Sequence, residues 1–273
     1  MVNGVKTMTH NDRDEQQRWS NYRSANKRFP SVRTAEITEL VRQANIRPGE
    51  TVLEIGTGSG IATYPLARAV GNTGKVLTFD TTKDNLIDVV LRNTEALTII
   101  PVPQSTEYNF PVPTNSVDAV ANIAALHHYD DRSKGTGYSG RQKALTEFYR
   151  MLKPGGRLII ADVAKGTPAH NYFDACDNPI HCAPRGHPHD FLSESEAQML
   201  CKKAGFKKAS YSIRPTPWRF TDETQAKEFL HTLHNSQCIP EESLELAKKH
   251  LPYKQVDQGV EMGWSLFYLK ARK

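Results

Sequence analysis

Short apolar runs alternate with longer amphipathic stretches through the first two thirds of the chain. The runs that predict buried strands cover residues 51–55, 75–79, 97–102, 116–123 and 157–163. Stretches with helical periodicity lie between these runs, at 61–70 and 142–152. Strands that alternate with helices in this way form β-α-β units, so the pattern predicts a parallel sheet.

The last third of the chain has a different pattern. Residues 174–189 are rich in proline, histidine and cysteine without periodicity, which predicts a loop. Ser193 with Glu196 three residues later is a capping-box pattern, so a helix should begin there. Two further strands are expected at 208–213 and 261–270. A helical lid or insertion is expected between them, at 220–250.

The composition fits one large domain. With 273 residues, of which 38% are apolar and 24% charged, the chain can close a full-sized core. Residues 1–20 are polar and charged, and no run approaches the roughly 18 to 20 apolar residues of a membrane span. Four cysteines are too few for a disulfide scaffold at this length, so we expect reduced thiols and a cytoplasmic location without membrane contact.

The net charge suits an anionic partner, but its distribution does not indicate one. The formal charge is +5, yet lysine and arginine are spread along the chain rather than gathered in one block. We therefore do not expect nucleic acid as a partner.

A glycine-rich turn follows the first predicted strand directly. Residues 52–55 lead into Gly56-Thr57-Gly58-Ser59-Gly60 and then into a helix, which places the turn at the carboxyl edge of the sheet, where such folds bind ligands. Glycine is needed where the backbone takes a positive φ or comes close to a ligand. A dinucleotide fingerprint needs G-x-G-x-x-G, whereas here the third glycine comes one place early and Ile61 stands at the expected position. The spacing argues against NAD.

An acidic residue ends the second predicted strand. Asp80 stands twenty residues beyond Gly60. A carboxylate there can accept hydrogen bonds from both hydroxyls of a ribose, as in several adenosine cofactor sites. With Glu54 and the G-x-G-x-G turn, it makes the chain resemble the class I S-adenosylmethionine-dependent methyltransferase family, whose first motif is a strand ending in E/D-x-G-x-G-x-G.

Two further segments carry the same resemblance. Residues 115–124 are similar to the family's fourth-strand motif, and 152–158, with the sequence Leu-Lys-Pro-Gly-Gly-Arg-Leu, are similar to its entry to the fifth strand. The matches together cover about residues 50–163. The resemblance implies an α/β fold with a doubly wound, mostly parallel seven-stranded sheet whose last strand is antiparallel.

The resemblance also implies a domain division. A helical segment at 1–45 would close the cofactor site, and 46–273 would form the methyltransferase domain. That domain would carry a substrate loop at 170–192 and a helical insertion at 220–255. Trp19 and Tyr22 in the first segment are candidates for aromatic walls of the pocket, or else they staple this segment to the core.

The cofactor implied by the resemblance is S-adenosylmethionine. In the family the glycine turn faces the methionine part, the second-strand acid holds the ribose, and residues after the third strand flank adenine. The chain departs from the family after the third strand, where 103–107 lack the usual acid and Ser105 or Thr106 would supply a hydroxyl contact. The cofactor residues expected here are Glu54, Gly56, Thr57, Gly58, Gly60, Asp80, Thr81, Ser105, Thr106, Asn122 and Tyr22.

Two adjacent histidines are candidates for a general base. Methyl transfer is an in-line displacement at a sulfonium, and a hydroxyl or amine acceptor must also lose a proton. His127 and His128 follow the fourth strand at its ligand-binding end, and imidazole titrates near neutrality. In an extended segment only one of the two points inward, and we choose His128, which Asp130 could orient. The alternative is catalysis by proximity alone, because the sulfonium is already activated.

Cysteine and histidine, residue types that can bind a metal ion, are scattered through the last third of the chain. Cys176, His181, Cys182, His187, His189 and Cys201 are ligand types, but they lack the paired spacing of recognised zinc sites. We predict no metal site. The loop is better suited to shaping an acceptor pocket.

The leading hypothesis is a methyltransferase for a small-molecule acceptor, acting as a monomer or homodimer. The additions around the motif region, about 50 residues before it and about 110 after it, can enclose such a molecule. An RNA or protein methyltransferase is the alternative, and a contiguous basic face leading to the cofactor would favour it. A non-catalytic binding scaffold is a third reading. Whether O, N, S or C accepts the methyl group stays open.

Overall fold

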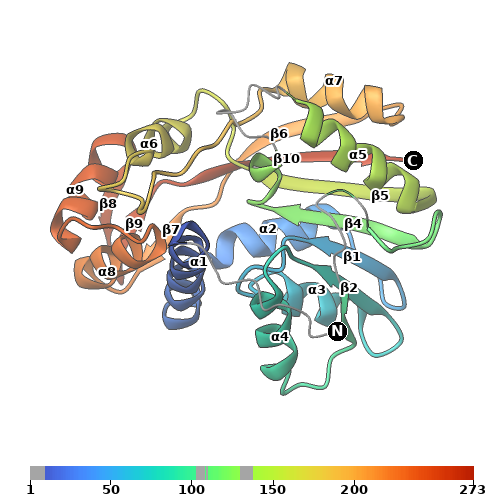
Figure 1. Ribbon diagram of the computed structural model, residues 1–273, viewed down its shortest axis with the longest axis horizontal. Helices are drawn as coiled ribbons and strands as arrows, with labels where there is room; N and C mark the ends of the chain where they lie inside the picture. Colours follow the sequence, from blue (N-terminus) through green and yellow to red (C-terminus); the bar gives the residue numbers. More distant parts are fainter. Residues whose placement is uncertain (1–9, 103–107, 109, 130–137) are drawn as a thin grey trace, which may run out of the picture.

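A seven-stranded sheet forms the centre of the molecule (Figure 1). The computed structural model describes residues 10–102, 108, 110–129 and 138–273. The strand order is β3-β2-β1-β4-β5-β10-β6, in which β10 runs antiparallel to both neighbours and the other pairs are parallel. The predicted doubly wound sheet with an antiparallel last strand is confirmed. Its strands are β1 (Thr51–Ile55), β2 (Lys75–Phe79), β3 (Ile99–Val102), β4 (Val117–Ile123), β5 (Leu152–Asp162), β6 (Ala209–Pro215) and β10 (Ser265–Arg272).

Helices cover both faces of this sheet (Figure 1). One face packs against α2 (Thr34–Ala44) and α3 (Thr63–Val70), and the other against α5 (Ser139–Met151) and α7 (Glu194–Ala204), while α4 (Lys83–Leu91) packs beside β3. Side chains of a strand alternate between the faces, so Val52 joins one core cluster while Leu53 and Ile55 join the other. This burial on both faces explains the continuous apolar runs.

Most predicted boundaries hold to within a few residues, with two informative differences. The capping box at Ser193 and Glu196 is present. The predicted fifth strand at 157–163 begins earlier, at Leu152, because that residue already pairs with Val117 before an irregularity in the register. The predicted strand at 261–270 is two strands, β9 (Gly259–Met262) and β10. The chain changes sheets between them, where the Gly263 N–H donates to the Pro252 carbonyl.

A second lobe is built from segments that lie between β5 and β10 in the sequence, and it is at the left of Figure 1. It holds the expected insertion, but as two helices, because Pro240 starts a new helix where a proline needs no hydrogen-bond donor. It also holds a short helix and a small antiparallel sheet, ordered β7-β9-β8, that the sequence pattern does not predict. Its further elements are α6 (Pro168–Cys176), α8 (Glu223–Leu233), α9 (Pro240–His250), β7 (Trp218–Phe220) and β8 (Tyr253–Val256).

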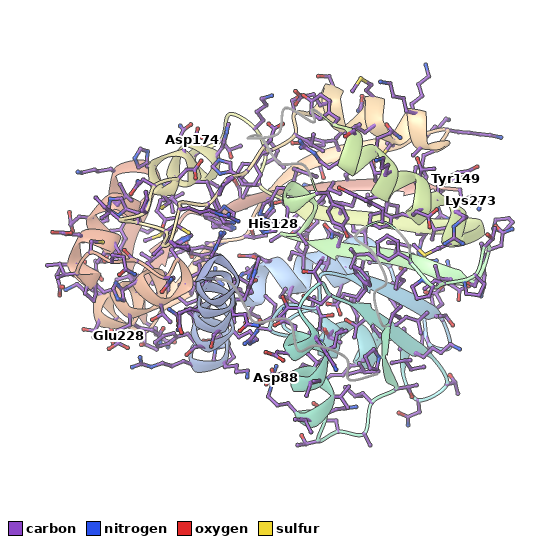
Figure 2. The ribbon with its side chains drawn as sticks, in the orientation of Figure 1. Asp88, His128, Tyr149, Asp174, Glu228 and Lys273 are labelled. Atoms are coloured by element: carbon purple, nitrogen blue, oxygen red, sulfur yellow. The ribbon has the colours of Figure 1, made fainter. Side chains whose placement is uncertain are left out.

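The N-terminal helix, α1 (His10–Arg28), lies between the sheet and this lobe. Its basic side chains form ion pairs in both directions: Lys27 with Asp88 of α4 at 2.6 Å and Arg28 with Glu228 of α8 at 2.6 Å. Figure 2 shows these two acids below α1, one toward each part of the molecule. The helix therefore ties the sheet to the second lobe.

Two sequence expectations concern thiols and the membrane. All four cysteines are free and buried. Across the part of the chain that the structure describes, no helix is both long and apolar enough to cross a bilayer.

Candidate active site

A cavity of about 190 Å³ lies at the carboxyl edge of the sheet, where β1, β2 and β4 end. The second lobe and α1 complete its wall, and His128 lies at this junction in Figure 2. This is the position at which doubly wound folds bind ligands. The sequence-predicted residues that line it are Tyr22, Gly56, Gly58, Asp80, Thr81, His127 and His128, with Trp19 beside them.

The glycine turn has the geometry that its sequence predicts. Gly56, Gly58 and Gly60 have φ of +87°, +52° and +79°, a region that other residues rarely adopt. A Cβ on Gly56 would lie 2.6 Å from the Ala125 side chain, and one on Gly60 would lie 2.7 Å from Val89. Both contacts are too short, so the turn requires glycine for its packing as well as for its dihedral angles.

Asp80 joins the turn to the end of β2. Its Oδ2 accepts a hydrogen bond from the Gly58 N–H and its Oδ1 accepts one from the Thr82 N–H, both at 2.7 Å. Burial raises the pKa of this carboxyl, while these backbone donors act in the opposite direction. The Asn85 side chain is a third donor to this carboxyl, and a carboxylate has about four acceptor positions, so acceptor capacity is left. Asp80 therefore fixes the turn and still offers acceptors to a diol in the cavity.

Four predicted cofactor residues do not line the cavity: Thr57 and Gly60 belong to the turn itself, and Glu54 and Asn122 support it from the strands. Glu54 Oε2 accepts hydrogen bonds from the Thr63 and Thr78 hydroxyls at 2.6 Å. The Asn122 side chain donates to the Ile55 carbonyl at 3.0 Å and so ties β4 to the end of β1. These contacts position the turn. Ser105 and Thr106 lie outside the described residues.

Glu54 is almost completely enclosed. Its Oε1 has no hydrogen-bond partner among the described residues, and both donors bind the other oxygen. Burial raises the pKa of this carboxyl to about 7, with a smaller contribution from the Asp80 charge. Its charge therefore changes near neutral pH.

The two histidines do not lie in an extended segment. Leu126–His128 form a 3₁₀ turn, so both rings line the cavity, and the expectation that only one points inward is wrong. The predicted orienting residue, Asp130, lies outside the described residues. Asp162, at the end of β5, fills that role for His127 instead: its two oxygens lie 2.9 and 3.0 Å from His127 Nδ1.

Asp162 is a functional candidate that sequence reasoning missed. It also accepts from the His127 and Val163 backbone N–H groups, so the carboxylate is fixed from three directions. A carboxylate can only accept, so Nδ1 of His127 carries a hydrogen, and in the neutral tautomer Nε2 has the lone pair. The available signal was its position, because an acid at the carboxyl end of a predicted strand points to the ligand-binding edge.

The predicted loop contributes one more imidazole to the cavity. The His187 ring centre lies 5.3 Å from that of His127 and 5.1 Å from that of His128. Burial lowers the pKa of both His128 and His187 well below 6.5, so both are neutral at pH 7. Of the other ligand types in the last third, Cys182 also lines the cavity.

Aromatic rings form much of the remaining wall. Trp218 and Trp264 stack at 4.1 Å between ring centres, and the edge of Trp19 approaches His128 at 5.5 Å. Phe173 completes this part of the wall, and Arg18 and Arg33 are the cationic residues that line the cavity. Trp218, Trp264 and Phe173 were not predicted, because they come from the second lobe and meet the site only in the fold.

Known proteins are similar to this chain in sequence. The family model described as a methyltransferase domain matches residues 53–160. The ubiquinone/menaquinone biosynthesis C-methyltransferase UbiE of Enterobacter sp. (strain 638) is 30% identical over 165 residues, which are 56% of this chain and 61% of that enzyme. The chain thus spans about three fifths of the length of this curated relative.

Solved structures show the same fold. A SAM dependent methyltransferase from Aquifex aeolicus has a TM-score of 0.51 and 23% identity, and the match covers 74% of this chain and 90% of that one. The YcgJ protein from Bacillus subtilis has a TM-score of 0.56 and 18% identity, covering 87% and 97%. The glycine turn and the strand that leads into it lie within the matched methyltransferase domain, so residues 53–160 are similar to methyltransferases in sequence, and the whole chain shares the fold of the solved class I enzymes.

Proposed function

We propose that the protein transfers a methyl group from S-adenosylmethionine to a small molecule held in the cavity. The observation that carries the proposal is the position of the glycine turn and Asp80 in the wall of a cavity that is also lined by aromatic rings. Methyl transfer needs the acceptor atom in line with the methyl carbon and sulfur, and an enclosed site supplies that orientation while it excludes water. A cytoplasmic monomer or homodimer is part of this proposal.

The shape of the site favours a small acceptor over a macromolecule. The cavity lies beneath α1 and the second lobe, and Trp19, Trp218 and Trp264 supply apolar surface for an organic molecule. Rings of this kind bury large areas and hold planar or apolar groups. The UbiE relative is named for C-methylation in quinone biosynthesis. We propose a small organic acceptor for this chain, and NMR of the methylated product would identify the atom that carries the methyl group.

For a hydroxyl or amine acceptor, we propose an imidazole of the cavity as the group that receives the proton. The sequence favours His128, but the contacts give more support to His127, since Asp162 fixes its ring and leaves Nε2 bare. A carboxylate that binds one ring nitrogen also stabilises the imidazolium that forms when the other takes a proton. If proximity alone accounts for catalysis, turnover should be nearly unchanged in the His127→Ala and His128→Ala variants.

Calorimetric titration tests the cofactor assignment. We expect saturable binding of S-adenosylmethionine and S-adenosylhomocysteine and none of NAD. Asp80→Ala should weaken binding by about 2 to 3 kcal/mol, because it removes a charge-assisted acceptor of the ribose and a support of the turn. Asp84→Ala, an exposed acid four residues on, is the matched control and should bind as the unmodified protein does. Saturation with the dinucleotide alone would overturn the proposal.

A further inference from the structure

Three imidazoles from distant parts of the chain meet at one point of the cavity wall. His127 and His128 come from the turn after β4, and His187 comes from the loop after α6. One ligand nitrogen from each residue lies within 4.8 Å of the other two. The ring centres are 4.0 to 5.3 Å apart. The rings are therefore grouped around a common centre rather than arranged along a surface.

Two ring nitrogens of these histidines lack partners among the described residues. His127 Nε2 and His187 Nδ1 are both buried, and neither has a hydrogen-bond partner among the described residues. Buried polar atoms in folded proteins are nearly always satisfied, so two orphaned nitrogens at one site indicate a group that binds between them. In the neutral His127 ring, Nε2 offers a lone pair to such a group, because the ring hydrogen is on Nδ1 and is bonded to Asp162.

We propose that His127, His128 and His187 bind one divalent first-row transition-metal ion such as Zn²⁺. Three histidine ligands with one open position form a known type of catalytic zinc site. The contact from Asp162 to His127 Nδ1 is the outer-shell carboxylate that such sites use to orient a ligand ring. Nitrogens at about 2.1 Å from a tetrahedral ion lie roughly 3.4 Å apart, so the three rings must move slightly closer together to bind it.

Charge around the centre is compatible with a cation. Asp162 supplies a negative charge directly behind His127. Arg18 is the positive charge on the other side, where it lies near His128 and His187 and donates to the Gly186 carbonyl at 3.4 Å. Among the described residues, the Asp162 carboxylate thus lies beside this centre and partly offsets the charge of Arg18.

A second cluster of ligand types, His170, Asp174 and His189, does not meet the same test. His170 Nδ1 accepts from the Gly166 N–H at 2.8 Å, and both ring nitrogens of His189 have partners, the His187 carbonyl and Asp174. These donors and acceptors already satisfy one another. The second cluster supports the loop that carries His187, and it serves as an internal control.

The open coordination position faces the cavity in which the acceptor is proposed to bind. This step rests on the proposed function. A hydroxyl or thiol bound to the ion loses its proton to solvent near neutral pH, since the metal lowers its pKa. The resulting oxygen or sulfur lone pair forms a bond to the methyl carbon while the bond from that carbon to the sulfonium breaks, which leaves the thioether. His127 and His128 then act as ligands rather than as free bases.

Metal titration of the stripped protein tests the inference. We expect one equivalent of Zn²⁺ to bind, and Co²⁺ in its place to give the visible absorption of a low-symmetry, four-coordinate site. His127→Ala and His187→Ala should each weaken Zn²⁺ binding by on the order of 100-fold or more. The more conservative Asp162→Asn should weaken it by roughly 10- to 100-fold. His170→Ala, in the second cluster, should bind Zn²⁺ as the unmodified protein does.

Cofactor titration on the same samples separates this inference from the proposed function. Binding of S-adenosylhomocysteine without stoichiometric Zn²⁺ would overturn the metal site and leave the methyltransferase proposal intact. Binding of Zn²⁺ in a protein that does not bind S-adenosylhomocysteine would overturn the methyltransferase proposal and leave the metal site intact. Equal Zn²⁺ affinity in the His187→Ala variant, with circular dichroism confirming its fold, would also overturn the site, as would loss of binding in His170→Ala alone.

Discussion

At the scale of single residues, the surroundings of Glu54 determine its charge. It is buried beneath the glycine turn, where two threonine hydroxyls bind one carboxyl oxygen and the other oxygen has no partner among the described residues. Burial raises its pKa from 4.5 to about 7. Between pH 4.5 and about 7, this carboxyl is therefore protonated to a greater extent in the folded protein than in the unfolded chain. Its contribution to the stability of the fold falls as the pH rises through this range.

This linkage predicts the effect of Glu54→Gln. The amide stays neutral, so the variant does not lose stability as the pH rises from 4.5 through about 7, whereas the unmodified protein does. Relative to the unmodified protein, the free energy of unfolding of the variant should rise by about 3 kcal/mol between about pH 5 and pH 8. Urea unfolding without cofactor measures it. Glu242→Gln, at an exposed site, is the control, and parallel pH profiles for Glu54→Gln and the unmodified protein would contradict the prediction.

The sequence predicts some site residues and not others for a physical reason. The glycine turn and Asp80 follow strands directly, so their place at the sheet edge comes from chain position alone. Asp162 also ends a strand, but its partner His127 lies 35 residues away, and this contact depends on packing. The approach of His187 to His127 likewise depends on how the second lobe folds back, which no local spacing encodes.

At the scale of elements, a buried ion pair joins α2 to its neighbours. The Arg33 guanidinium donates twice to Glu36 Oε2, at 3.0 and 2.6 Å, and also to the Tyr22 hydroxyl of α1. The Trp218 indole of β7 donates to the other Glu36 oxygen. Glu36 is fully buried, so its charge depends on these donors. One carboxylate thus connects α1, α2 and the second lobe.

Removing this carboxylate should be costly. Glu36→Ala leaves the Arg33 charge and the Trp218 N–H buried without their acceptor, and we expect the free energy of unfolding to fall by about 3 to 5 kcal/mol. Glu39→Ala on the same helix removes the pair with the largely exposed Arg42 and should cost no more than about 1 kcal/mol. Denaturant unfolding of the two variants compares them directly. Similar losses in both would show that the buried network does not hold α2 in place.

Element prediction succeeded where the pattern is long and failed where it is short. Strands of the main sheet are buried on both faces and read as apolar runs, and the helix at Ser193 has its capping box. The strands of the small sheet have three or four residues each, too few for a period to be visible. The helix α6 begins at a proline and packs against α9, a partner far along the chain.

At the scale of the whole molecule, α1 stands between solvent and the cofactor site. The cavity holds about 190 Å³, and pockets for drug-sized ligands usually hold roughly 300 to 1,000 Å³. A cofactor together with an acceptor therefore needs more space than this arrangement gives. Arg18, Trp19 and Tyr22 of α1 line the cavity, so movement of this helix is the simplest way to enlarge it. Closure of the site by residues 1–45 stays a prediction.

Two ion pairs connect α1 to the rest of the molecule without lining the cavity. Lys27 binds Asp88, and Arg28 binds Glu228, with side chains that are 38% and 59% exposed, respectively. Exposed pairs of this kind contribute about 0.2 to 1 kcal/mol each, so removing both should weaken closure by about 1 kcal/mol. We expect a Lys27→Ala, Arg28→Ala double variant to release S-adenosylhomocysteine roughly five-fold faster, because that free energy corresponds to about this factor in a rate.

Stopped-flow fluorescence measures the effect, since Trp19 lies in the cavity wall on the helix that moves. The matched control is Arg68→Ala, which removes the ion pair with Glu95, exposed to a similar degree and distant from α1. That variant should release the cofactor at the rate of the unmodified protein, because the ion pair that it loses does not connect α1 to the rest of the molecule. Faster release in both variants would indicate a general electrostatic effect. Unchanged release in the double variant would mean that the cofactor leaves without displacement of α1.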